Sequence, residues 1–244
     1  VRDAILGRIP GDWDITTSAH PEEVKQVFGH TIDTGLQHGT VTVMRDHIGY
    51  EITTYRIDGE YEDGRHPKEV VFTAELREDL RRRDFTINAM AYSHETGIVD
   101  IFGGAEDLAA RRIRCVGDAG ERFTEDALRI LRAVRFSAQL GFSIEKKTWQ
   151  ALCELAPSLV HVSKERVQVE LTKTLLSDRP EFIWKTEAAG LAPYISKTFP
   201  EVFAAWKKQK SCAKQRLEEK VYSKDVPAAD KDAIKTETAA QQGH

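Results

Sequence analysis

The feature of this sequence that most constrains its fold is a single change of pattern along the chain. Before the change, residues 40–44 (TVTVM) and 50–56 (YEITTYR) are rich in β-branched residues and are joined by RDHIG, which predicts a β-hairpin. From Glu106 onward, the pattern is mostly helical. This order predicts an α+β chain, with a mixed sheet-and-helix head over residues 1–96 followed by a helical half.

Shorter signals predict the local elements. Residues 12–18 (DWDITTS) follow a Pro-Gly turn and predict a short strand, and a helix is expected from Pro21 to about Phe28. Residues 57–69 are polar and predict a loop. Over residues 125–140 the spacing predicts a long helix, with Thr124 as its N-cap and Gly141 at its C-terminal end. Two further helices are expected over residues 146–157 and 163–177.

Composition excludes several classes of protein. Hydrophobic residues make up 41% of the 244 positions and charged residues 30%, which is an ordinary globular balance. No apolar run approaches the roughly 20 residues of a membrane span. The net charge of −4 argues against indiscriminate coating of nucleic acid. Three cysteines far apart in sequence, Cys115, Cys153 and Cys212, favour neither zinc nor disulfides and fit a reducing cytoplasm.

Two acidic residues stand two positions apart on the first predicted strand. Asp12 and Asp14 would then point to the same face, where paired carboxylates can hold hard cations such as Mg²⁺. Glu51, in a neighbouring β-rich run, is the candidate for a third carboxylate. A polar strand edge with no function is the alternative, because short motifs also match by chance.

Basic residues gather in two places. Arg81, Arg82 and Arg83 precede Asp84 and an abrupt apolar run, so they are either a solvated surface or partly buried phosphate ligands. On the predicted helix over residues 125–140, Arg129 and Arg132 point away from the apolar side. A solvated amphipathic helix would show the same split.

The same helix carries groups that can read a base. Asp126 and Arg129 are i,i+3 neighbours, and a carboxylate beside a guanidinium matches the pairing edge of cytosine or adenine. Uracil and guanine present the wrong group where those bases carry an amine. Arg132 and Arg135 would remain for the triphosphate or for further base contacts.

At this point the sequence resembles a known family. VRDAILGRIPGDWDITTSAHPEEV, RRDFTINAMA, EDALRILRAVRFSAQLGF and KERVQVELTKTL are similar, in this order, to motifs of class II tRNA nucleotidyltransferases and bacterial poly(A) polymerases. The resemblance runs from Val1 to roughly Leu176. It implies a polymerase-β-like nucleotidyltransferase head, a mixed sheet with helices, followed by an all-helical neck and body.

The resemblance also implies the site. It makes Asp12 and Asp14 the Mg²⁺ ligands and, with Glu51, the catalytic carboxylates. It makes a set of six side chains the nucleotide contacts: Arg2, Arg83, Asp126, Arg129, Arg132 and Arg135. The loop at 57–69 matches the family's flexible element, and its presence favours full CCA addition.

The family pattern also suggests a division of the chain. We expect a head at 1–96, a neck with the base-selecting helix at 97–160, a partial helical body at 161–205 and a solvated or disordered polar tail at 206–244. Two departures bear on activity. The Gly-Gly pair that opens the family's first motif is absent before Val1, so the head is expected to be truncated, and little family pattern follows about Pro200.

The predicted function is therefore template-independent transfer of CMP, CMP and AMP from CTP and ATP to the tRNA 3′-hydroxyl. Poly(A) polymerase, CC-only and A-only enzymes share the same scaffold and stay open. An RNA-binding domain that has lost turnover is a more distant alternative, and the sequence does not indicate an oligomeric state.

Overall fold

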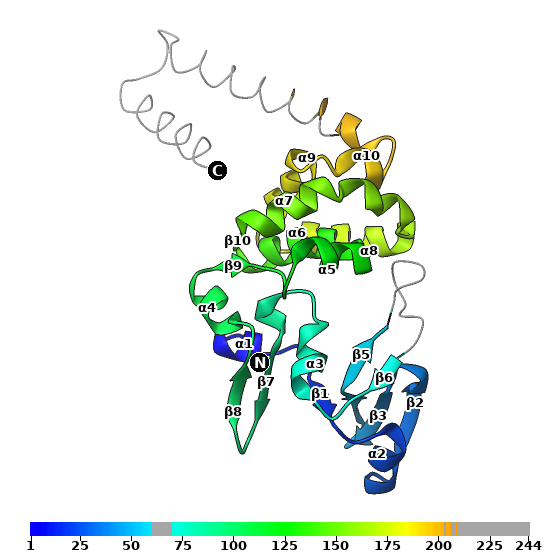
Figure 1. Ribbon diagram of the computed structural model, residues 1–244. Helices are drawn as coiled ribbons and strands as arrows, with labels where there is room; N and C mark the ends of the chain where they lie inside the picture. Colours follow the sequence, from blue (N-terminus) through cyan, green and yellow to red (C-terminus); the bar gives the residue numbers. More distant parts are fainter. Residues whose placement is uncertain (60–69, 203, 206–207, 209–244) are drawn as a thin grey trace, which may run out of the picture. The chain divides into compact units, whose positions relative to one another are not determined.

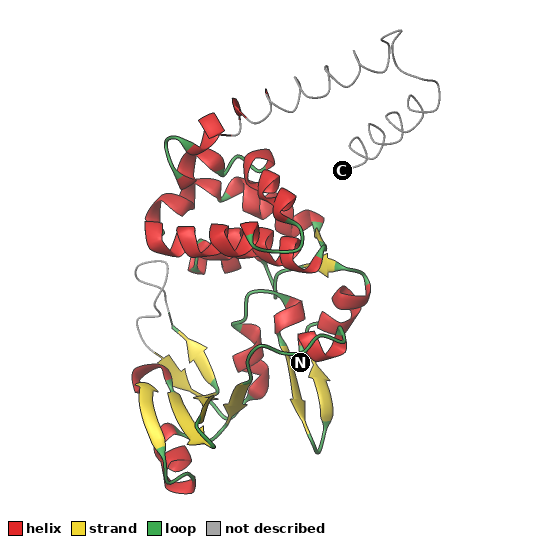
Figure 2. Cartoon of the chain, turned by 180° about the vertical axis from the view of Figure 1, so that it is seen from behind, coloured by secondary structure: helices red, strands yellow, loops and turns green. Residues whose placement is uncertain are grey.

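The computed structural model describes residues 1–59, 70–202, 204–205 and 208. The chain divides into two compact units, Val1–Ile195 and Ser196–His244, and the first holds every helix and strand named below. Figures 1 and 2 show the first unit from opposite sides, with most strands at one end and a layer of helices at the other. In the described ranges, no helix combines the length and apolarity that crossing a membrane requires.

The largest sheet has four strands in the order β1-β4-β3-β2. β1 (Asp14–Thr17) runs parallel to β4 (Ile48–Thr54), and β3 (Thr40–Arg45) is antiparallel to both β4 and β2 (Thr31–Gly35). The mixed sheet confirms the α+β prediction. The predicted strand over 12–18 is shorter than expected, because Asp12 and Trp13 precede the first residue that pairs.

One face of this sheet carries the core of the head. Val41, Val43 and Ile52 point to that face and pack with Val24 of the helix α2 (Pro21–Val27). Period-two alternation places apolar side chains on this face and polar ones on the other. The helix α2 confirms the prediction of a helix from Pro21. The opposite face of the sheet carries threonines and the carboxylates of Asp14 and Glu51.

The predicted hairpin is confirmed as β3–β4, but its turn is tighter than RDHIG suggested. Asp46 and His47 alone form the connection, both with positive φ, 51° and 64°. That conformation matches the twist of the two strands it joins. The 3-10 turn η1 (Leu36–His38) links β2 to β3.

A small second sheet pairs β5 (Arg56–Asp58) with β6 (Val70–Phe72). The loop predicted over 57–69 therefore starts later than expected, because Ile57 and Asp58 belong to β5. Residues 60–69 of that loop lie outside the described residues.

The middle of the chain folds into short elements. They are α3 (Leu76–Arg81), η2 (Thr86–Asn88), the antiparallel pair β7 (Met90–Ser93) and β8 (Gly97–Asp100), α4 (Gly104–Ala109) and β9 (Arg112–Ile113). α4 packs closely on η2: a Cβ on Gly104 would lie 2.3 Å from the carbonyl oxygen of Thr86. Only glycine permits that approach.

The helical half confirms the second part of the prediction. Its elements are α5 (Ala119–Glu125), α6 (Leu128–Leu140), α7 (Lys146–Glu154), η3 (Ala156–His161), α8 (Lys164–Leu175), η4 (Pro180–Ile183), α9 (Trp184–Ala188) and α10 (Ala192–Ile195). The short strand β10 (Ser143–Ile144) pairs in parallel with β9. The helix α1 (Arg2–Ile5) is the first helical turn of the unit.

Two predictions about the long helix were wrong. It is broken at Asp126, which has an extended backbone with φ −144° and ψ 103°, so α6 starts at Leu128. Thr124 is therefore no N-cap: it lies inside α5, and its hydroxyl donates to the carbonyl of Gly120. Gly141 does end the helix as predicted, with a positive φ of 67°.

The alternative of a solvated amphipathic helix was also wrong. α6 is buried on almost every side, and even Arg129 and Arg135 expose only 9% and 7% of their surface. Charged side chains at such positions need paired partners. The arginines of α6 therefore belong to an interior network.

Candidate active site

The parallel pairing of β1 and β4 brings two carboxylates side by side. Asp14 is the register partner of Glu51, so both side chains point to the same face of the sheet. Both residues are exposed, and in the described part of the chain neither carboxylate has a hydrogen-bond or ion-pair partner. The pairing brings together two of the three predicted catalytic acids.

Asp12 has a different environment. It lies two residues before β1, and its Oδ1 accepts a hydrogen bond of 2.8 Å from the backbone N–H of Trp13. The strand geometry that was expected to align Asp12 with Asp14 does not apply there. A shared role for these two acids stays a prediction.

The face around the two carboxylates is lined by hydroxyl groups. Thr16 donates to the Thr53 carbonyl, and the Thr40 and Thr53 hydroxyls are 3.0 Å apart. Within the described ranges, no three acidic, histidine or cysteine side chains converge to hold a metal ion. Two free carboxylate groups nevertheless suit Mg²⁺, which commonly takes one or two protein carboxylates and completes its shell with water and phosphate oxygens.

A cluster of four arginines, Arg2, Arg83, Arg132 and Arg135, lies on α6 and on the segments that contact it. Arg2 of α1 donates to the amide oxygen of Asn88 at 2.7 Å and pairs with Asp3. Asn88 in turn donates to Asp84 Oδ1 at 3.0 Å. These hydrogen bonds form one continuous chain of contacts, which joins α1 to η2 and to Asp84.

Asp84 is the anionic centre of that chain. Arg132 binds its Oδ2 through both Nε, at 2.8 Å, and Nη2, at 2.6 Å. Burial opposes ionisation of Asp84, but Arg132, Asn88 and the N–H of Phe85 outweigh it, so the pKa of this carboxyl falls below its ordinary value. The pair is charged at neutral pH, and a buried ion pair of this kind holds its two elements in register.

Arg135 makes the second strong pair of α6. Its Nε donates to Glu170 of α8 at 2.5 Å, and its Nη1 donates to Gln139 at 2.9 Å. Burial lowers the pKa of Arg135, although Glu170 opposes that shift. A guanidinium stays protonated under all ordinary conditions, so the pair remains ionic.

Two of the three arginines before Asp84, Arg82 and Arg83, are partly buried. Asp79 is fully buried and binds Arg82 at 2.8 Å and Arg83 at 3.2 Å. The Nε of Arg83 is buried without a hydrogen-bond partner. Arg81 differs, because 68% of its side chain is exposed and it reaches only Glu78, at 3.9 Å.

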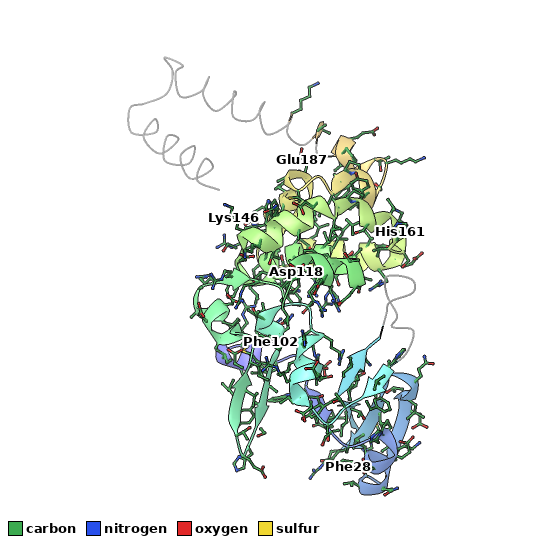
Figure 3. All side chains as sticks on the ribbon, viewed as in Figure 1. Phe28, Phe102, Asp118, Lys146, His161 and Glu187 are labelled. Atoms are coloured by element: carbon green, nitrogen blue, oxygen red, sulfur yellow. The ribbon has the colours of Figure 1, made fainter. Side chains whose placement is uncertain are left out.

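The predicted base-reading pair is engaged elsewhere. Asp126 accepts the N–H of Leu128 on Oδ1 at 3.0 Å and Arg166 of α8 on Oδ2 at 2.8 Å. Arg129 binds Glu125 at 2.6 Å and the carbonyl of Arg82 at 3.2 Å. Asp126 stands between α5 and α6, directly after α5, whose N-cap Asp118 is labelled in Figure 3. Asp126 and Arg129 are thus neighbours whose charged groups bind different partners.

The sequence analysis did not predict the side chains that bind these arginines and Asp126. Arg166 and Glu170 lie four apart on α8, the spacing of a local ion pair, yet each binds a residue of another element. Asn88 and Asp79 gave no signal of their own. Only their positions beside the charged run RRRD could have marked them.

Residues 1–114 match the Poly A polymerase head domain, and residues 141–202 match the probable RNA and SrmB-binding site of polymerase A. The CCA-adding enzyme of Leuconostoc mesenteroides is 55% identical over 179 residues, 73% of this chain and 45% of the relative. That of Enterococcus faecalis is 49% identical over 195 residues, 80% of this chain and 46% of the relative. The chain belongs to the tRNA nucleotidyltransferase and poly(A) polymerase family.

Solved structures of the family agree with the fold. The Bacillus stearothermophilus CCA-adding enzyme in complex with CTP has a TM-score of 0.73 and 45% identity, over 80% of this chain and 47% of that one. The Thermotoga maritima CCA-adding enzyme complexed with tRNA_CCA has a TM-score of 0.64 and 26% identity, over 79% of this chain and 45% of that one. The chain spans less than half the length of these relatives. The domain boundaries at 96, 160 and 205 stay predictions for this family member.

Proposed function

We propose that the protein is a CCA-adding tRNA nucleotidyltransferase, which transfers CMP, CMP and AMP from CTP and ATP to the 3′ end of tRNA. The observation that carries the chemistry is the pairing of Asp14 with Glu51 on the polar face of the sheet. The choice of substrates rests on relatives at 49–55% identity that are CCA-adding enzymes, and on the solved relatives with CTP and with tRNA.

In this proposal Asp12 and Asp14 would hold Mg²⁺, with Glu51 as the supporting carboxylate. Mg²⁺ bound there supplies the positive charge that activates the tRNA 3′-hydroxyl and steadies the leaving pyrophosphate. The 3′-oxygen bonds to the α-phosphorus, the bond from that phosphorus to the β-phosphate oxygen breaks, and the hydroxyl proton passes to solvent. The carboxylates keep the two reacting groups in line.

The arginine cluster holds the nucleotide. Arg2, Arg83, Arg132 and Arg135 supply the positive charge for the triphosphate, because guanidinium forks match phosphate oxygens. Asp126 and Arg129 select cytosine and adenine by accepting from the exocyclic amine and donating to ring acceptors. Since Arg166 and Glu125 hold these two groups in the structure, base binding exchanges those partners.

A second candidate is poly(A) polymerase, because residues 1–114 match the Poly A polymerase head domain. The two functions differ in their nucleotide. A poly(A) polymerase uses ATP alone, whereas CCA addition requires CTP first.

We further propose a cytoplasmic setting, which suits the unpaired cysteines Cys115 and Cys153 of the described chain.

The test supplies the intact protein with a tRNA that ends before CCA, with Mg²⁺, and with CTP or ATP separately and together. CCA addition predicts extension by two residues with CTP alone and by three with both nucleotides. Long ATP-only extension would instead support the poly(A) candidate. Normal CMP incorporation by Asp12→Ala would refute the assigned chemistry.

A further inference from the structure

One phenyl ring lies beneath three of the arginines of the cluster. The Phe136 ring of α6 has the guanidinium carbon of Arg135 at 4.0 Å from its centroid, that of Arg2 at 5.1 Å and that of Arg132 at 5.4 Å. All three distances fall within the range over which the negative face of an aromatic ring attracts a cation. Phe136 is only 5% exposed, so little water weakens these contacts.

The ring is itself fixed in place. Phe85, which is fully buried, meets Phe136 edge to face, with centroids 5.8 Å apart and planes at 80°. This T-shaped arrangement is a favoured geometry for aromatic pairs. The orientation of Phe136 is therefore set by the residue that directly follows Asp84.

Each of the three cations is paired with a carboxylate in the structure. Arg2 pairs with Asp3, Arg132 with Asp84, and Arg135 with Glu170. Each pair restrains one guanidinium. Asn88 connects Arg2 to the Asp84 carboxylate that Arg132 binds, but in the described part of the chain Arg135 and Glu170 lie outside that connection. The element common to all three arginines is the Phe136 ring.

From this arrangement we infer that Phe136 is a positioning residue that gathers Arg2, Arg132 and Arg135 into one binding site for a polyphosphate. The inference rests on the proposed function, which makes these arginines triphosphate ligands. A ring that arranges the guanidinium groups before binding removes the ordering that a phosphate chain would otherwise impose. Its contribution should therefore grow with the number of phosphates in the ligand and vanish for a nucleoside.

The experiment measures equilibrium binding of CTP, CMP, cytidine and inorganic pyrophosphate at constant Mg²⁺ and ionic strength. It compares the unaltered protein with Phe136→Leu and Phe136→Tyr. Loss of three cation–ring contacts is expected to weaken CTP and pyrophosphate binding about tenfold in the leucine variant. Cytidine binding should be unchanged, and the tyrosine variant, which keeps the aromatic face, should restore most of the CTP affinity.

Phe142→Leu is the matched control. Phe142 lies just beyond the end of α6, is 4% exposed, and has Arg111, outside the cluster, 5.7 Å from its centroid. The control removes the same ring at the same depth and should leave pyrophosphate affinity unchanged. Thermal melting checks that each variant folds. Phe136→Met, whose unbranched apolar side chain adapts to irregular space but has no aromatic face, replaces the leucine variant if that one does not fold.

Several outcomes would overturn the inference: unchanged pyrophosphate binding in Phe136→Leu, an equal loss for cytidine and CTP, or the same loss in Phe142→Leu. Absence of pyrophosphate and CTP binding in the unaltered protein would overturn it too. Failure of the proposed function looks different, because the unaltered protein would then bind pyrophosphate through this site yet incorporate neither CMP nor AMP.

Discussion

Arg132 binds Asp84 through two of its nitrogens, although 48 positions separate the two residues in the chain. This ion pair ties α6 to the residue that precedes Phe85 and η2. Because Asn88 extends the pair to Arg2, one connected network of ion pairs and hydrogen bonds joins the first helical turn of the unit to α6. The arginines that we propose as nucleotide ligands are therefore also parts of the interior structure.

The Asp84–Arg132 pair predicts how stability depends on pH. The folded pKa of Asp84 lies below its ordinary value of 3.8, so its stabilisation is fully present above that value and is lost as pH falls through the folded pKa. Asp84→Asn should lower the free energy of unfolding by about 2 kcal/mol at neutral pH. Thermal melting from pH 7 to strong acid should show this difference shrinking below about pH 4, and parallel curves for both proteins would contradict the assignment.

The acid pair on the sheet predicts a large effect on catalysis. Asp14→Asn or Glu51→Gln removes one negative charge from the proposed metal-binding face and should reduce CMP incorporation at least about 100-fold. Asp46→Asn is the control, because it makes the same change in an exposed turn whose positive φ asparagine tolerates. Activity within about twofold of normal in both active-face variants would rule out the metal role.

Asp126→Asn predicts a change in base selection. An amide can donate to the carbonyl of uracil, which a carboxylate cannot do, so the preference for CTP over UTP should fall about tenfold. Competition between the two nucleotides in one reaction measures this ratio. Glu121→Gln, an exposed acid of α5, should leave it unchanged, and an equal fall in that control would disconnect Asp126 from base reading.

Cys115 should resist alkylation while the protein is folded. Burial is the main cause that raises the pKa of its thiol to about 12, and the side chain is only 2% exposed. Since the thiolate is the reactive form, iodoacetamide near neutral pH should modify Cys115 only after unfolding. Peptide mass spectrometry separates Cys115 from the other cysteines. Rapid labelling of Cys115 in the native protein would contradict its placement.

Gly104→Ala should destabilise the protein by about 2 kcal/mol, because the added Cβ meets the Thr86 carbonyl and η2 must shift. Urea unfolding measures the difference. Gly29→Ala is the matched substitution at a position where nothing lies within 4 Å of the new Cβ, and it should have little effect. Equal stability of the two variants would show that α4 is not packed on η2 in this way.

Local signals in the sequence predicted the local structure. Alternating β-branched residues gave the hairpin β3–β4, and a glycine able to take a positive φ gave the end of α6. The break at Asp126 was not predictable in this way, because EDALR has helical character throughout. Tertiary contacts decide it: Arg166 and the N–H of Leu128 hold the Asp126 carboxylate, and the backbone there is extended.

The ion-pair partners in the site could not be predicted from the sequence, because they are distant along the chain. The residue types at Arg132, Arg135 and Asp126 suggested ligand contacts, but their partners Asp84, Glu170 and Arg166 lie 35 to 48 positions away. Periodicity records which side of a helix a residue occupies and not what packs against it. Asp12 shows the same limit. It stands only two positions before Asp14, yet Asp14 begins the strand β1, whereas Asp12 lies outside the strand and accepts from the backbone N–H of Trp13.

The strand order of the head has a consequence for synthesis and folding. Asp14 meets Glu51 only through the β1–β4 pairing, and β4 is made after β2 and β3. Such non-local pairings bear the entropy of closing a long loop and form slowly. A nascent or partly unfolded head therefore carries its two acids apart, and the proposed metal site forms only when β4, the last of these strands, has paired with β1.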